Sequence, residues 1–92
     1  MQYRFLYHPL VKEMDLPKLN ATMKKRIKAA VEKRLLTEPE KYSEPLRKTL
    51  KGYRKLRVGD YRIVLRVDKD LIYILGICHR KDVYARVERR ID

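Results

Sequence analysis

The alternation of apolar and polar residues predicts a strand at the N-terminus of the chain. Within residues 2–7, Tyr3, Phe5 and Tyr7 fall on one face, and Gln2 and Arg4 fall on the other. This period of two is typical of a β-strand, and Pro9 marks its end.

A long amphipathic helix is predicted from Pro17 onward. Lysines occupy much of the rest of the helical wheel. The apolar residues recur at every fourth position: Leu19, Met23, Ile27, Val31 and Leu35. Asp15, ahead of Pro17, is read as the start signal, and the helix must end before Pro39. Residues 37–52 then read as a connection with a short turn that buries Leu46 and Leu50.

The second half has the pattern of three antiparallel strands followed by a helix. The strands are expected at residues 54–58, 61–67 and 71–77, because turn-type sequences such as Gly59-Asp60 separate them. The third strand is apolar on both faces, which favours a central position.

Helical spacing returns after residue 79, at Val83, Val87 and Ile91. Asp82 is expected to cap this short C-terminal helix. Its outer face would hold three arginines: Arg86, Arg89 and Arg90. Together the elements predict an α+β fold, a single domain over residues 1–92 in which an N-terminal strand and helices pack on a small antiparallel sheet.

Charge is the most distinctive compositional feature. The 92 residues carry 24 Lys and Arg against 12 Asp and Glu, a net charge of +12. Such a charge favours a polyanionic partner, with nucleic acid as the leading class. The single cysteine cannot form an internal disulfide, the two histidines and this cysteine lack zinc-site spacing, and no apolar stretch could span a membrane, so we expect a cytoplasmic protein without a metal.

Strand alternation gathers part of this charge on one sheet face. In a two-residue hairpin at Gly59-Asp60, Arg57 faces Arg62 and Lys55 faces Val64. The core face would then hold Leu56, Val58, Tyr61, Ile63 and Leu65, and the open face would hold Lys55, Arg57, Arg62 and Arg66. A merely solvated face would also alternate, but such faces usually mix both signs, and this one has no acids in its strands.

Three segments of the chain resemble a known family. Leu50-Lys51-Gly52-Tyr53, then Leu56-Arg57-Val58-Gly59-Asp60-Tyr61-Arg62-Ile63-Val64, then His79-Arg80-Lys81-Asp82-Val83-Tyr84 are similar to the RelE/ParE superfamily of toxin–antitoxin toxins, especially its RelE-like branch. The resemblance implies a microbial-RNase-like fold and a ribosome-dependent mRNA endonuclease, an mRNA interferase that acts in the ribosomal A site. It also implies a cognate antitoxin, which the charge suggests is acidic and partly disordered.

The resemblance also implies site residues. Lys55, Arg62, Arg80 and Tyr84 match the family's catalytic positions, and the neighbouring RNA-binding candidates are Arg54, Arg57, Arg66, His79 and Lys81. Tyr53 departs from the pattern, because RelE-type enzymes usually have a second lysine there.

RNA can be cut without a metal or cofactor when its own 2'-hydroxyl attacks the adjacent phosphorus. The protein then supplies a base, cations for the phosphate and an acid for the leaving oxygen. Lys55, whose neutral form is favoured by the surrounding cations, is the candidate base; Tyr84 is an alternative base or a stacking platform, and His79 is a candidate acid. Two other functions stay open: a ParE-like, non-enzymatic inhibitor of DNA gyrase, and an inactive RNA-binding relative.

Overall fold

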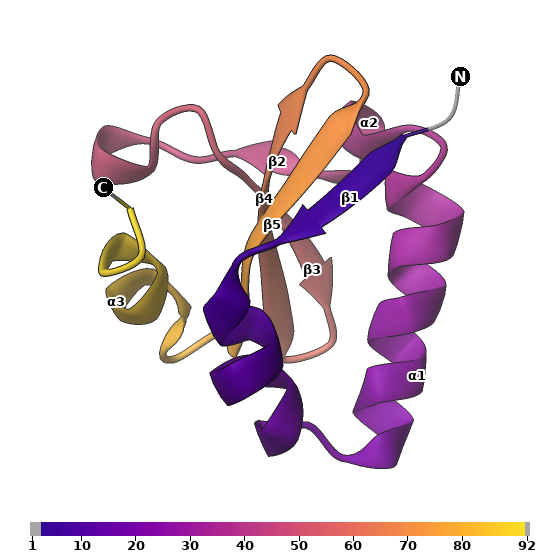
Figure 1. The fold of residues 1–92 in the computed structure, drawn as a ribbon, viewed down its shortest axis with the longest axis vertical. Helices are drawn as coiled ribbons and strands as arrows, with labels where there is room; N and C mark the ends of the chain where they lie inside the picture. Colours follow the sequence, from indigo (N-terminus) through magenta and orange to yellow (C-terminus); the bar gives the residue numbers. More distant parts are fainter. Residues whose placement is uncertain (1–2, 92) are drawn as a thin grey trace.

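The computed structural model describes residues 3–91, which form a five-stranded sheet with helices on both faces (Figure 1). The strands are β1 (Arg4–Tyr7), β2 (Glu44–Pro45), β3 (Arg54–Val58), β4 (Tyr61–Asp68) and β5 (Leu71–His79). Their order is β1-β5-β4-β3-β2, with β1 parallel to β5 and the other neighbours antiparallel. The predicted α+β fold and its three-stranded meander are thereby confirmed, and β5 lies inside the sheet as expected.

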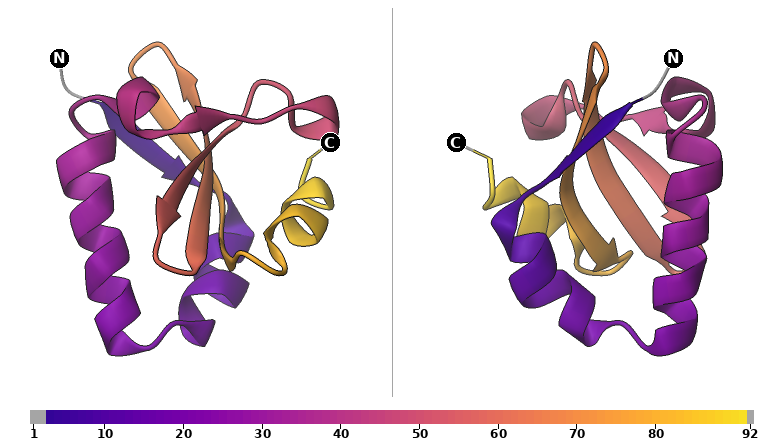
Figure 2. Two further views of the ribbon diagram at one scale, coloured as in Figure 1. Left: turned by 180° about the vertical axis from the view of Figure 1, so that it is seen from behind. Right: turned by 45° about the vertical axis from the view of Figure 1, so that its right-hand side comes forward.

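The helical elements occupy both sides of the sheet and the connection between β1 and β3. They are η1 (Val11–Asp15), η2 (Leu16–Lys18), α1 (Ala21–Ala30), η3 (Val31–Leu35), α2 (Pro39–Tyr42), η4 (Lys48–Leu50) and α3 (Val83–Glu88). Figure 2 shows α1 against one face of the sheet and α3 against the other. None of the helices within residues 3–91 is long and apolar enough to cross a membrane.

The larger core lies between the sheet and α1. The apolar stripe expected along α1 and η3 is confirmed, since Leu35 is fully buried and Ile27 and Val31 are buried in the same cluster. From the sheet, alternate residues of β3 and β4 face this core, including Leu56 and Ile63.

The start of the long helix differs from the expectation. Asp15 does not begin it; the chain is already helical from η1 through η2, with Pro17 at an N-terminal position of η2. The cap of α1 is Asn20, whose side chain accepts a hydrogen bond of 2.8 Å from the Met23 amide. Proline is tolerated in the first turn of any helix. Pro17 alone therefore could not show whether the long helix begins at Asp15 or at Asn20.

A second difference from the expectation concerns the exposure of side chains on the outer strand β1. The strand predicted over residues 2–7 is present as β1, with Gln2 outside the described residues. Phe5 packs on the larger core, but Tyr7 is 45% exposed and Leu6 is 54% exposed. β1 is one of the two outer strands of the sheet, so these side chains have a neighbouring strand on one side only.

The opposite sheet face is only partly open, contrary to the expectation for the basic strands. A second core of Leu50, Val64, Leu75, Cys78, Val83 and Val87 lies there under α3. Val64 is fully buried although it alternates with cations. Arg90, expected on the outer face of the C-terminal helix, is also buried and pairs with Asp15. Asp82 occupies the cap position of α3, but its side chain makes no capping hydrogen bond.

Candidate functional site

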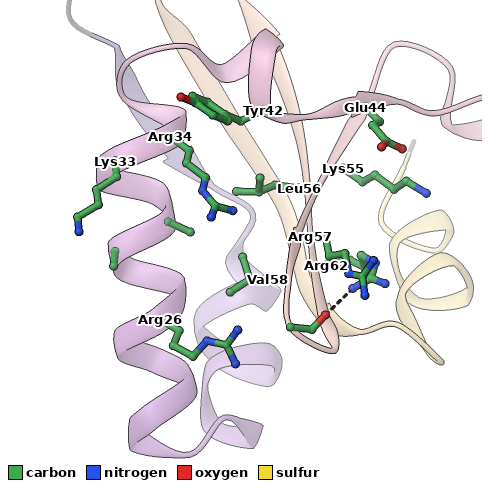
Figure 3. Close-up of a pocket in the computed structure, with 13 residues that line it drawn as sticks. Arg26, Lys33, Arg34, Tyr42, Glu44, Lys55, Leu56, Arg57, Val58 and Arg62 are labelled. Carbon is green, nitrogen blue, oxygen red and sulfur yellow. Dashed lines mark hydrogen bonds between the residues drawn. The ribbon is translucent and has the colours of Figure 1, made fainter.

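The β3–β4 hairpin sets the framework of the candidate site. Its register is confirmed: Arg57 lies opposite Arg62, and Lys55 lies opposite Val64. Gly59 has a φ of +60° at the first turn position, a conformation that glycine adopts without strain and that suits a tight hairpin. Figure 3 shows Lys55, Arg57 and Arg62 on the same side of the hairpin, away from α1.

Tyr84 reaches this face from α3. Lys55 Nζ donates a hydrogen bond of 3.3 Å to the Tyr84 hydroxyl, although the two residues are 29 positions apart in the chain. Lys55 is half-buried and Tyr84 is 38% exposed, so both polar ends remain accessible to a ligand. An amine and a phenol within hydrogen-bond distance can exchange a proton with each other and with a bound substrate.

Arg62 and Arg80 each bind the turn of the hairpin. Arg62 Nη1 donates hydrogen bonds to the Gly59 carbonyl at 3.0 Å and the Tyr61 carbonyl at 2.9 Å. The Arg80 amide donates to the Asp60 carbonyl at 2.8 Å, and the Arg80 guanidinium lies 3.8 Å from the Asp60 carboxylate. The ion pair between Arg80 and Asp60 is exposed and therefore weak, so it leaves the Arg80 guanidinium free to bind an anion.

The structure places the remaining sequence candidates in three different surroundings. Arg54 binds Ser43 Oγ at 2.7 Å and the Glu40 and Ser43 carbonyls, so it ties α2 to β3. His79 pairs with Tyr61 in the sheet, with an edge-to-face ring contact of 5.4 Å, which puts it on the α1 side of the sheet, away from Lys55.

Arg66 and Lys81 stay on the surface. The Arg66 guanidinium lies 5.4 Å from the ring centres of both Tyr53 and Tyr73, a cation–π arrangement that leaves the arginine exposed. The Lys81 side chain is exposed in the turn before α3, where its amide donates to His79 Nδ1. The cluster that comes together is therefore Lys55, Arg57, Arg62, Arg80 and Tyr84.

Two kinds of residue near this cluster were not anticipated from the sequence. Glu44 of β2 lies directly opposite Lys55 in the sheet, so the cationic face does contain an acid (Figure 3). The other residues are cations of the long helix that face the hairpin across a groove of about 750 Å³: Arg26, Lys33 and Arg34.

The groove exists because β2 pairs with only two residues of β3, which leaves the rest of β3 as a sheet edge beside α1. Its charged lining comprises Arg26, Lys33, Arg34, Lys55, Arg57 and Arg62, with Glu44 as the acid. None of these cations forms a salt bridge within residues 3–91. The sequence does carry a signal for the α1 side: Arg26, Ala29, Ala30, Lys33 and Arg34 follow the i, i+3, i+4, i+7, i+8 spacing of one helix face.

The arrangement of cations along the groove suits a polyanionic ligand. Among residues 3–91, no three His, Cys, Asp or Glu side chains come close enough together to hold a metal ion. Arginine forks can bind phosphate through paired hydrogen bonds, and the open groove admits an extended ligand.

Comparisons with known proteins agree with this architecture. The family model described as "ParE toxin of type II toxin-antitoxin system, parDE" matches residues 6–84. Toxin RelG of Mycobacterium tuberculosis is 39% identical over 54 residues, which cover 56% of this chain and 62% of that protein. The match thus spans less than two thirds of that relative's length.

Solved structures share the fold over most of both chains. A chain of the toxin–antitoxin complex RelBE2 from M. tuberculosis has a TM-score of 0.78 at 28% identity, covering 87% of this chain and 100% of that one. A chain of the RelB–RelE complex from Methanococcus jannaschii has a TM-score of 0.65 at 26% identity, covering 88% and 96%. A variant of E. coli toxin RelE in the free state covers all of both chains, with a TM-score of 0.73 at 22% identity, and supports the fold alone.

The family match extends over most of the chain, and it includes the hairpin, the turn that carries Arg80 and the start of α3 with Tyr84. The chain therefore belongs to the ParE toxin family and is a type II toxin–antitoxin toxin of the RelE/ParE superfamily.

Proposed function

We propose that this toxin is a ribosome-dependent mRNA interferase, an endoribonuclease that cuts messenger RNA and so inhibits translation in the cytoplasm. The observation that carries the proposal is the 3.3 Å contact between Lys55 Nζ and the Tyr84 hydroxyl beside the paired arginines Arg57 and Arg62. A candidate base, a candidate acid and phosphate-binding cations thus share one accessible face.

The chemistry follows from these groups. Lys55 in its free-amine form takes the proton of the 2'-hydroxyl, whose oxygen bonds to the adjacent phosphorus. The bond from phosphorus to the 5'-oxygen breaks, and the Tyr84 hydroxyl donates its proton to that oxygen. The products are a 2',3'-cyclic phosphate and a free 5'-hydroxyl, and the Lys55 ammonium returns a proton to Tyr84 across their hydrogen bond.

Arginines stabilise the charge that develops on the phosphate in this scheme. Arg62 lies next to the pair on the same sheet face, and Arg80 approaches from the turn of the hairpin. Removing one such donor typically costs about 10²–10³ in rate. The cations across the groove, Arg26 of α1 and Lys33 and Arg34 of η3, are well placed to bind the RNA backbone on either side of the cut.

Partners follow from the same surface. The groove is open to solvent, so it does not enclose a substrate by itself, and we propose that the ribosome presents and orients the mRNA. We also propose a cognate antitoxin with an acidic, partly disordered segment, because an acidic chain complements the net charge of +12 and the similar RelE proteins occur in toxin–antitoxin complexes.

Expression in a bacterial host tests the proposal. The wild type is expected to arrest growth and to leave cuts in ribosome-bound mRNA, whereas Arg62→Ala and Tyr84→Ala should do neither. Arg89→Ala is the matched control, because Arg89 is an exposed arginine beyond the end of α3 and should leave both effects intact. Equal toxicity of all four proteins, or growth arrest without mRNA cleavage, overturns the assignment.

The ParE family match supports a second candidate, a non-enzymatic inhibitor of DNA gyrase. In one cell extract, a gyrase inhibitor would block plasmid supercoiling and leave mRNA whole, whereas an interferase would do the reverse. A third candidate, an RNA-binding relative without cleavage activity, rests on Tyr53 at the usual lysine position, and it would bind RNA in the same extract but change neither readout.

A further inference from the structure

Helix α3 is too short to hold its own position. It spans Val83–Glu88, six residues. An isolated helix of this length is unstable in water, because fixing its first turn costs more than its few hydrogen bonds return. Tyr84 approaches Lys55 only by way of α3, so whatever fixes α3 also sets their contact.

A buried ion pair lies where the end of α3 meets the sheet. Arg90 Nη1 and Nη2 donate to the two carboxylate oxygens of Asp15 at 2.7 and 2.8 Å. Arg90 Nη1 also donates to the Leu75 carbonyl at 3.0 Å. The side chains are 3% and 0% exposed, and the hydrogen bond to Asp15 raises the pKa of Arg90, so the arginine stays charged.

Asp15 is itself fixed by the sheet. β1 pairs with β5 only as far as Ile74, so the next part of that β5 edge has no strand partner. Helix η1 covers this edge, and Asp15 Oδ2 accepts the Ile77 amide at 2.9 Å. The Asp15 carboxylate therefore joins three parts of the chain: η1, β5 and the segment after α3.

The surroundings of Gly76 and Cys78 show that α3 packs closely against β5. A Cβ added to Gly76 would lie 2.6 Å from Val87 Cγ1 and 3.1 Å from Arg90 Nη1, so only glycine admits this approach. Cys78, 4% exposed, lies beneath the same helix with its Sγ 3.7 Å from Asp15 Oδ1.

We propose that Asp15 and Arg90 are positioning residues for the Lys55–Tyr84 pair: their buried, two-pronged ion pair anchors α3 to the edge of β5 and thereby holds the Tyr84 hydroxyl against Lys55 Nζ. The catalytic consequence rests on the proposed function, but the anchoring itself does not. Neither residue contacts the substrate face, since both side chains are buried.

Arg90→Lys tests the anchor with little change in charge. Lysine keeps the positive charge but lacks the planar fork that binds both carboxylate oxygens. The matched control is Arg89→Lys, at the exposed neighbour. Fluorotyrosine is incorporated in place of tyrosine, and fluorine NMR spectra are recorded. The resonance that is missing from the Tyr84→Phe spectrum belongs to Tyr84. We expect that resonance to move in Arg90→Lys toward its position in Lys55→Met, and to stay in place in Arg89→Lys. An unmoved resonance in Arg90→Lys overturns the proposal.

Thiol labelling gives a second readout that needs no RNA. Cys78 is the protein's one cysteine, so its labelling under native conditions measures how often α3 lifts. Losing one charge-assisted hydrogen bond should raise that rate about tenfold or more in Arg90→Lys. A rate equal to that of the wild type contradicts the anchor. Should Arg90→Lys fail to fold, Asp15→Asn removes the charge, keeps an acceptor for Ile77 and is read in the same way.

Cleavage kinetics separate positioning from general stability. Arg90→Lys should lower kcat by about tenfold to a hundredfold, as expected when a reacting group is displaced, and leave KM unchanged. This loss should disappear in a Tyr84→Phe background. The same loss in both backgrounds would assign Arg90 a merely structural role. If the wild type cuts no RNA, the proposed function fails, while the resonance and labelling experiments still decide whether the anchor exists.

Discussion

Replacing one arginine of α1 and one of η3 tests whether the groove beside β3 binds the RNA backbone. Arg26 and Arg34 line the groove from one side, and Lys55, Arg57 and Arg62 line it from the other. The variant Arg26→Gln with Arg34→Gln removes two positive charges from exposed side chains, so it should leave the fold intact.

The magnitude follows from counterion release. For single strands, the slope of log affinity against log salt is about −0.7 for each phosphate neutralised. If each of the cations Arg26, Lys33, Arg34, Lys55, Arg57 and Arg62 binds one phosphate, the wild-type slope is about −4, and the double variant should have a slope of about −3.

Fluorescence anisotropy of a labelled, 2'-O-methyl RNA measures this slope without cleavage, because the methylated oxygen cannot attack phosphorus. A salt series from about 50 to about 200 mM covers the sensitive range. Lys12→Gln with Lys24→Gln is the control, since these lysines line a separate, apolar groove between β1 and α1 and the charge change is the same. Equal slopes for the two double variants would refute binding in the β3 groove.

Two other predictions concern α3 and the strand beneath it. Gly76→Ala should lower the free energy of unfolding in urea by about 1–3 kcal/mol, because its Cβ would lie 2.6 Å from Val87 Cγ1; an unchanged midpoint would contradict this packing. Burial raises the pKa of Cys78 to about 11. The buried thiol therefore stabilises the fold fully below pH 9 and loses this effect as the pH rises from about 9 to about 11. The stability difference between wild type and Cys78→Ala should shrink over that range, and a constant difference would count against it.

Local patterns predicted much of the hairpin and of the long helix. A two-residue turn fixes the pairing of the strands that it joins, so Gly59-Asp60 was sufficient to place Arg57 opposite Arg62. The stripe along the long helix likewise identified Ile27 and Leu35 as core residues, because helical spacing alone determines a shared face.

Contacts between distant segments could not be predicted in this way. Asp15 and Arg90 are 75 residues apart, and each has an ordinary local interpretation, as a helix start and as an exposed helical arginine. Their burial depends on the early end of β1, which leaves the Ile77 amide without a strand partner. Glu44 was missed for a related reason, since a strand of only two residues has no period to detect.

The sheet face that carries Lys55 shows both what the sequence pattern predicted and what it could not predict. Alternation correctly separated Lys55 from Leu56, but it could not tell that α3 covers Val64 on the same face as Lys55. That cover is what brings Tyr84 to Lys55. The resemblance to known toxins suggested both residues, and their 3.3 Å contact became visible only in the folded chain.

Analysis of the RNA ends in a reconstituted translation reaction tests the proposed cleavage chemistry. We expect cuts in ribosome-bound mRNA with 2',3'-cyclic phosphate and 5'-hydroxyl ends, slowed about 10²–10³-fold by Arg62→Ala. Intact mRNA with the wild-type protein, or cuts that leave 3'-hydroxyl and 5'-phosphate ends, would contradict the proposed chemistry of Lys55, Arg62 and Tyr84.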